Sequence, residues 1–152
     1  MSGKDHKVAA LLESVETGPH DPHFAGYFRC FNEQKFYEAH DVLEALWLQD
    51  RNGQDGDFFK GLIQFSGAFV HLQKKRLRPA WKLFRLCTIY LAKYPSPHLA
   101  LDVANVLRLA KRWGEAAQAV GCEGGLLVKE QPPKLSLSGF MSFKFEVQPA
   151  EN

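Results

Sequence analysis

The sequence predicts an all-α fold, a compact bundle of four main helices and a shorter N-terminal helix, with a C-terminal tail that is irregular or forms a short β-strand. Apolar residues recur at helical spacing through most of the chain, and alternation of period two occurs only near its end. The length of 152 residues suits one domain. We therefore expect a single bundle domain over residues 1–121 and a C-terminal extension over residues 122–152.

The first elements are separated by clear breaks. A weakly amphipathic segment covers residues 8–15, and the Gly-Pro pair at residues 18–19 interrupts the chain after it. A short helix follows, and its inward residues are Phe24, Tyr27, Phe28 and Phe31. Asn32 marks a turn or cap before the next helix, at residues 36–48. The short loop at residues 50–56 after that helix favours an antiparallel neighbour.

The next helix, at residues 57–75, has a wide apolar arc that is typical of the central helix of a bundle. Its main stripe is Phe58, Leu62, Phe65, Phe69 and Leu72, beside a second stripe of Phe59, Ile63 and Val70.

Two further helices complete the predicted bundle. Arg78-Pro79 places a proline in the first turn of one helix, which the prolines at residues 95–97 end. Its inner stripe is expected to be Ala80, Leu83, Cys87 and Tyr90. The last helix, at residues 98–120, ends at Gly121, and its apolar residues are Leu99, Val103, Val106, Ala110, Trp113, Ala117 and Val120.

The tail lacks the helical pattern. Apolar and charged residues alternate over residues 140–147, which predicts one strand. Because a lone strand leaves its backbone unpaired, this strand requires residues 126–129 as a hairpin partner, or another subunit in a homodimer. The alternative is that the tail is disordered.

Composition excludes several classes of protein. The net charge of +2 does not by itself indicate a nucleic-acid binder, and the three cysteines lack the spacing of zinc or redox sites. We expect free thiols in a reducing compartment. Because the N-terminus lacks a secretory signal and the apolar stretch at residues 58–72 is too short to cross a bilayer, we expect a cytoplasmic protein.

The most informative stretch is the helix at residues 36–48. At about 100° per residue, His40 and Glu44 fall within its apolar face, while Glu38 and Asp41 take the opposite, wet face. Because burying an unpartnered carboxylate costs several kcal/mol, the pair requires a partner. It can serve as a general base, hold a metal, or fix the packing of neighbouring helices as a structural pair.

The central helix offers further polar residues for a cleft with this pair and Trp47. Gln64 and His71 lie two turns apart on one stripe. If the two helices pack antiparallel, His71 approaches His40, and His40, Glu44 and His71 form a ligand set for one divalent metal. The alternative is that Gln64 and His71 lie on a solvated face.

A basic cluster follows the central helix. It consists of Lys74, Lys75, Arg76 and Arg78, with Lys82 and Arg85 one and two turns further on. Such a cluster is typical of a helix C-terminus exposed to solvent. It can also bind RNA or a phosphate, with Trp81 as a stacking platform.

Two segments resemble a known family. FNEQKFYEAHDVLEALW and FFKGLIQFSGAFVHLQKK are similar to the signature of domain-of-unknown-function family 309. The matching positions are Phe31, Asn32, Tyr37, His40, Glu44, Trp47, Gly61, Leu62, Ile63, Gln64 and His71. The resemblance covers residues 24–95 and implies a helical bundle without an established activity. The extended C-terminal segment departs from it.

The leading hypothesis is a module that binds a partner or small ligand at a cleft lined by His40, Glu44, Trp47, Gln64 and His71. This function does not require catalysis. One alternative is a metal-dependent hydrolase that uses His40, Glu44 and His71, with Glu38 or Asp41 nearby. A second alternative is RNA binding through the basic surface at residues 74–85.

Overall fold

The computed structural model describes residues 3–119 and 126–138. Over these ranges the chain forms six helices of ten or more residues and one short helix, with isolated bridges as the only β-structure. The helices are α1 (Gly3–Leu12), α2 (Pro22–Asn32), α3 (Phe36–Gln49), α4 (Gly56–Gln73), α5 (Leu77–Leu91), α6 (Val103–Gln118) and α7 (Leu126–Lys129). The all-α prediction is confirmed, whereas the predicted count of four main helices and one shorter helix is wrong.

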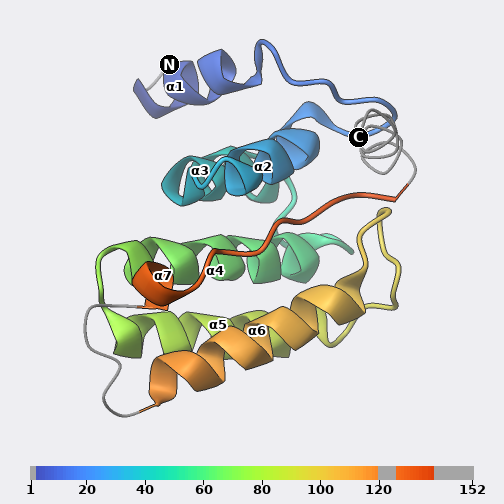
Figure 1. Cartoon of the computed structure of the whole chain (residues 1–152). Helices are drawn as coiled ribbons and strands as arrows, with labels where there is room; N and C mark the ends of the chain where they lie inside the picture. The colour runs from blue at the N-terminus through green and yellow to red at the C-terminus, as the bar shows by residue number, and fades with distance from the viewer. Residues whose placement is uncertain (1–2, 120–125, 139–152) are drawn as a thin grey trace, which may run out of the picture.

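The helices are stacked in order along the molecule. α1 lies at one end above α2 and α3, α4 occupies the middle, and α5 and α6 form the other end (Figure 1). Consecutive helices from α2 to α6 contact each other, and the short loops that connect α2, α3, α4 and α5 favour antiparallel neighbours. In the part of the chain that the structure describes, no helix is long and apolar enough to span a bilayer.

Local sequence explains where several helices begin. The Asp21 side chain accepts a hydrogen bond from the His23 backbone N–H at 2.7 Å and caps α2, whose first residue is Pro22. The predicted break before α2 is therefore confirmed. The amphipathic segment also forms a helix, but α1 begins at Gly3 and ends at Leu12, ahead of the predicted range.

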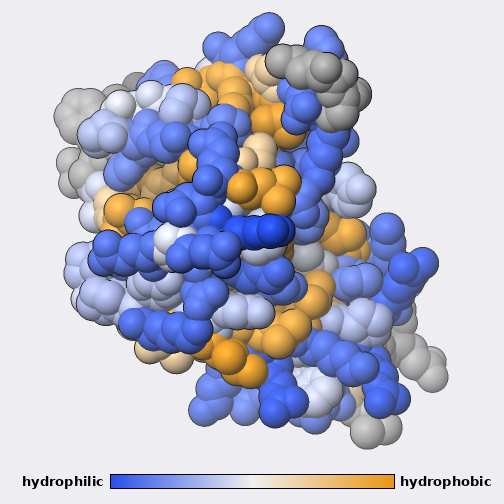
Figure 2. Space-filling view, turned by 180° about the vertical axis from the view of Figure 1, so that it is seen from behind, coloured by the Kyte–Doolittle hydropathy of each residue, from blue (hydrophilic) through white to orange (hydrophobic). Residues whose placement is uncertain are grey.

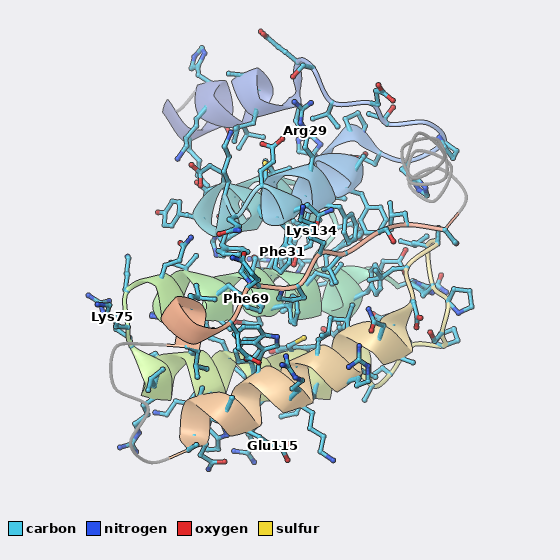
Figure 3. All side chains as sticks on the ribbon, in the orientation of Figure 1. Arg29, Phe31, Phe69, Lys75, Glu115 and Lys134 are labelled. Carbon is cyan, nitrogen blue, oxygen red and sulfur yellow. The ribbon has the colours of Figure 1, made fainter. Side chains whose placement is uncertain are left out.

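An aromatic cluster forms the centre of the core. The Phe31 and Phe65 rings stack with centroids 5.4 Å apart, and the Phe69 ring meets that of Trp113 at 5.2 Å. Phe31 and Phe69 lie between the upper and lower helices in Figure 3. These two ring contacts join α2 to α4 and α4 to α6. All the predicted inward residues of α2 and the main stripe of α4 are buried: Phe24, Tyr27, Phe28, Phe31, Phe58, Leu62, Phe65, Phe69 and Leu72.

The structure corrects two predicted helices in the second half. The buried stripe of α5 is Ala80, Phe84, Cys87 and Leu91, whereas the predicted inner residues Leu83 and Tyr90 are half-buried. α6 begins five residues later than predicted, at Val103, because Asp102 caps it by accepting from the Asn105 backbone N–H at 3.0 Å. Leu99 therefore lies in a loop and is exposed.

The described part of the tail packs on the bundle. Leu135 and Leu137 are buried, and Asn32 exchanges two hydrogen bonds with the Leu135 backbone at 2.6 and 2.7 Å. The predicted hairpin partner at residues 126–129 is wrong, because this segment is α7. The predicted strand at residues 140–147 and the helix end at Gly121 lie outside the described residues. The proposed boundary at residue 121 stays a prediction.

Candidate functional site

The His40–Glu44 pair lies on α3, whose core side is formed by Phe36, Ala39, Val42 and Leu43. His40 and Glu44 lie at the edge of this apolar side, with 31% and 26% of their side chains exposed. Their predicted place in the middle of a buried face is therefore wrong. The Tyr37 side chain, on the far side of the pair, is 53% exposed. The buried part of the apolar face therefore ends at the pair instead of extending on both sides of it.

Two lysines of α1 lie against Asp41 and Glu44 of α3. Lys4 Nζ donates a hydrogen bond to Glu44 Oε1, and lies 3.5 Å from Asp41 Oδ1. Lys7 Nζ lies 3.9 Å from Asp41 Oδ2. The bond to Glu44 raises the pKa of the Lys4 ammonium above its ordinary value. The pair thus has the partner that burial of a carboxylate requires.

Asp41 is the main departure from the predicted faces of α3. Its side chain is 6% exposed, beneath α1, although the helical pattern predicts a wet position. His40 Nδ1 lies 3.3 Å from Asp41 Oδ1, and His40 Nε2 lies 4.0 Å from Glu44 Oε2. The imidazole therefore lies between two carboxylates. The position of α1, which covers Asp41, could not be inferred from the α3 sequence.

Aromatic side chains flank the pair along the same stripe. The Tyr37 ring stacks on the His40 ring with centroids 6.2 Å apart, and Lys7 Nζ lies 5.3 Å from the Tyr37 centroid. Trp47, one turn beyond Glu44, is half-buried. Because the four residues are spaced three or four apart, they form one stripe: Tyr37, His40, Glu44 and Trp47.

One side-chain contact joins this stripe of α3 to α4. Lys60 Nζ lies 4.3 Å from the Trp47 ring centroid, a cation–π contact that joins the two helices. Gln64 and His71 follow Lys60 at helical spacing, and both are half-buried. We call the combined region the α3–α4 surface, defined by Tyr37, His40, Glu44, Trp47, Lys60, Gln64 and His71.

His71 lies at the end of α4 near the basic cluster. Partial burial of its ring, with the positive charges of Arg76 and Lys74, lowers the pKa of His71 below its ordinary value. Its Nδ1 atom is buried and has no hydrogen-bond partner.

The predicted metal ligands are not gathered into one centre. Among the described residues, no three His, Cys, Asp or Glu side chains form a group that could hold a metal ion. His40, Glu44 and His71, all of which are described, therefore do not make such a ligand set, and the predicted metal site is not supported.

The predicted basic residues are exposed around the turn between α4 and α5. They are Lys74, Lys75, Arg76 and Arg78, and Lys75 extends from the end of α4 in Figure 3. Trp81 is half-buried one turn into α5. The basic residues are thus available to solvent, while Trp81 is partly packed against the core.

Three pockets lie away from the α3–α4 surface. One of about 530 Å³ lies between α1 and α3, one of about 410 Å³ between α5 and α6, and one of about 430 Å³ beside the tail. None of them is lined by His40, Glu44, Trp47, Gln64 or His71. The polar side chains therefore form a surface instead of lining one of these cavities.

The structure contains one polar cluster that the sequence did not predict. His98 Nε2 lies 2.8 Å from Asp55 Oδ1, and the His98 ring lies against those of Phe58 and Tyr94. Tyr94 donates a hydrogen bond to the Gln54 carbonyl at 2.9 Å. These contacts tie the loop after α3 to the loop before α6. Residues 55 and 98 are too far apart for a local pattern to reveal their pairing.

Comparison with known proteins gives a match within the helical core. Residues 24–83 match the model of a family described as a domain of unknown function, DUF309. The matched range begins in α2, ends in α5 and includes every residue of the α3–α4 surface. No curated protein and no solved structure matches the chain. The match over residues 24–83 confirms the resemblance to DUF309 that the two sequence motifs indicate.

Proposed function

We propose that the protein is a binding module that docks a peptide segment of a partner protein on the α3–α4 surface. The observation that carries this proposal is the stripe on α3, where Tyr37 and Trp47 flank the His40–Glu44 pair. Seen from behind, the molecule shows apolar patches among polar ones rather than a uniform polar coat (Figure 2).

The chemistry of the stripe suits recognition of a peptide. Tyrosine and tryptophan are enriched at protein interfaces, because each offers a large apolar ring together with a polar atom. Tyr37 is more than half exposed and Trp47 is half-buried, so both retain area that a partner can cover. Gln64 adds amide groups that can pair with a peptide backbone.

The ion network supports binding because it holds the stripe in one conformation. Lys4 and Asp41 hold Glu44 and His40 on either side, so these side chains are ordered before a partner arrives. A surface that is already ordered loses less conformational entropy on association.

The two alternatives are less well supported. The metal-dependent hydrolase lacks a group of ligands in the described residues. RNA binding at the basic surface stays a prediction, as do a cytoplasmic location and a homodimer. The exposed aromatic stripe therefore favours a protein partner.

The proposal is tested by quantitative affinity purification from the source cell. We expect Tyr37→Ala to reduce capture of at least one protein about tenfold or more, because it removes an exposed aromatic anchor. Leu99→Ala is the matched control, since Leu99 is also an exposed apolar residue but lies in the loop before α6. A peptide of the captured protein is then titrated against both purified variants.

A second substitution separates binding from folding. His40→Gln keeps a hydrogen-bonding side chain beside Asp41, so the free energy of unfolding should change little while capture falls. If Tyr37→Ala, His40→Gln and Leu99→Ala retain the same proteins as the unmodified chain, the proposal is wrong.

A further inference from the structure

The groove between α5 and α6 is a second surface, at the end of the helix stack (Figure 1). Its floor is formed by Phe84, Ala110 and Gly114, which are buried, and by the half-buried Leu107. Gly114 permits close packing there, because a Cβ atom at this position would lie 3.2 Å from Phe84 Cβ. The groove is therefore an apolar channel between two antiparallel helices.

The other end of the stack shows how such a pair of helices is covered. α1 packs across α2 and α3, where Val8 is buried and Leu12 fills the space above Gly26. A Cβ atom at residue 26 would lie 2.4 Å from Leu12 Cδ2. One helical pair of this fold thus accepts a short helix whose apolar side chains rest on a glycine, and the α5–α6 pair also has a glycine in its floor.

The rim of the groove is mainly basic. Arg85 on α5 and Lys111 on α6 line it, opposed by one acidic lining residue, Glu115. Glu115 projects from the outer side of α6 in Figure 3. Arg78 and Lys82 precede Arg85 by two turns and one turn, so they extend the same basic rim. Within the described ranges, neither Arg85 nor Lys111 is in an ion pair.

We propose that the α5–α6 groove binds an acidic amphipathic helix of a partner protein. The apolar side of that helix rests on Leu107 and Trp81, as the apolar side chains of α1 rest on α2 and α3. Its acidic flanks pair with Arg85 and Lys111. α1 of a second copy fits less well, because Lys4 and Lys7 would meet a basic rim. The groove shares no residue with the α3–α4 surface, so this proposal stands or fails independently of the proposed function.

The test uses two designed helical peptides of about 14 residues, or four helical turns. Both carry leucines at i, i+3 or i+4 and i+7, and their flanking positions are glutamate in one and lysine in the other. Binding to the full chain is measured by fluorescence anisotropy, and the contact residues are mapped by NMR chemical-shift changes. We expect the glutamate peptide to bind at least tenfold more tightly, with shifts concentrated at Trp81, Leu107 and Lys111.

Charge reversal tests the assigned rim. The double variant Arg85→Glu, Lys111→Glu should weaken binding of the glutamate peptide about tenfold or more, because it turns attraction into repulsion. Lys134→Glu is the control, since Lys134 is an exposed lysine on the tail. Equal affinity for both peptides, no binding by either, or shifts outside the groove would overturn the proposal. So would a single-stranded RNA that displaces the glutamate peptide from these residues, because the groove would then be a nucleic-acid site.

Discussion

Asp41 is the buried charge at the contact between α1 and α3. Its carboxylate is almost fully buried and lies 3.5 Å from Lys4 Nζ. We expect Lys4→Gln to lower the free energy of unfolding by about 1 kcal/mol, because it removes the main cation from Glu44 and Asp41 while Lys7 and His40 remain. Urea denaturation measures the change.

The sign of the pH dependence at Lys4 follows from its raised pKa. The hydrogen bond to Glu44 makes the folded chain hold this proton more tightly than the unfolded chain, whose ordinary value is 10.5. The stabilisation is thus complete below pH 10.5 and is lost as the pH rises through the higher folded pKa. Lys134→Gln, at an exposed residue, should leave the free energy of unfolding close to that of the unmodified chain. An equal effect of both substitutions would contradict the role given to Lys4.

His71 affects the pH dependence of stability in the opposite direction, and its effect falls in the acidic range. Because burial lowers the pKa of His71, the unfolded chain takes up its proton at a higher pH than the folded chain does. Its contribution to stability is complete well above the ordinary value of 6.5 and declines as the pH falls through that value toward the folded pKa. We expect His71→Gln to flatten the slope of unfolding free energy between about pH 7 and pH 5.

A matched histidine gives the control for that slope. His6 is exposed on α1, so His6→Gln should leave the free energy of unfolding close to that of the unmodified chain. If His71→Gln leaves the acidic slope as steep as in the unmodified chain, the orphaned Nδ1 and the burial of this ring have no energetic consequence.

Two glycines of α4 set the distance between α4 and α5. A Cβ atom at Gly61 would lie 2.8 Å from Leu91 Cγ and 3.3 Å from Tyr90 Cβ, whereas one at Gly67 would lie 3.1 Å from Leu83 Cδ1. We expect Gly61→Ala to destabilise the protein by about 1–3 kcal/mol through overpacking. Gly67→Ala should be close to neutral, because a methyl tip can move and alanine favours the helix by up to about 1 kcal/mol. Thermal unfolding of both variants measures this difference, and equal losses would contradict it.

At the scale of elements, local signals predicted the helices better than their ends. The aromatic stripes of α2 and α4 and the proline and glycine breaks are local properties, so α2, α3 and α4 lie close to their predicted ranges. α6 begins at Val103, later than predicted, because the Asp102 side chain caps the helix there. The apolar residue Leu99, which suggested an earlier start, lies before this cap. Residues 126–129 form a helix instead of a strand, since their place is fixed by packing on α4, which is remote in sequence.

At the scale of the whole molecule, the tail contributes to the core. Leu135 and Leu137 are at most 2% exposed, and Ser136 between them is exposed. We expect Leu135→Ala and Leu137→Ala each to cost about 2–5 kcal/mol, because each leaves a cavity. Ser136→Ala, the control, should change stability by less than about 0.5 kcal/mol. Denaturant unfolding that gave the same midpoint for all three variants would show that the tail is not part of the folded unit.

The candidate site was only partly predictable, for a physical reason. Spacing on one helix identified His40, Glu44 and Trp47 as one stripe, and the family match includes them. Lys4, which binds Glu44, lies 40 residues before it on α1, so no local pattern could pair the two. The same holds for the contacts of Lys4 and Lys7 with Asp41. The predicted metal site requires the His71 side chain of α4 to lie beside the His40 side chain of α3. Residue spacing within each helix does not determine whether the two side chains lie close together.

The most direct test of binding at the α3–α4 surface is site-specific photocrosslinking in the source cell. Benzoylphenylalanine replaces Tyr37 in one version of the chain and Leu99 in another, and both positions are exposed. We predict that irradiation links a partner protein to the first version and not to the second, with the crosslinked peptide identified by mass spectrometry. The same products at both positions, or no product at position 37, would contradict binding at this surface.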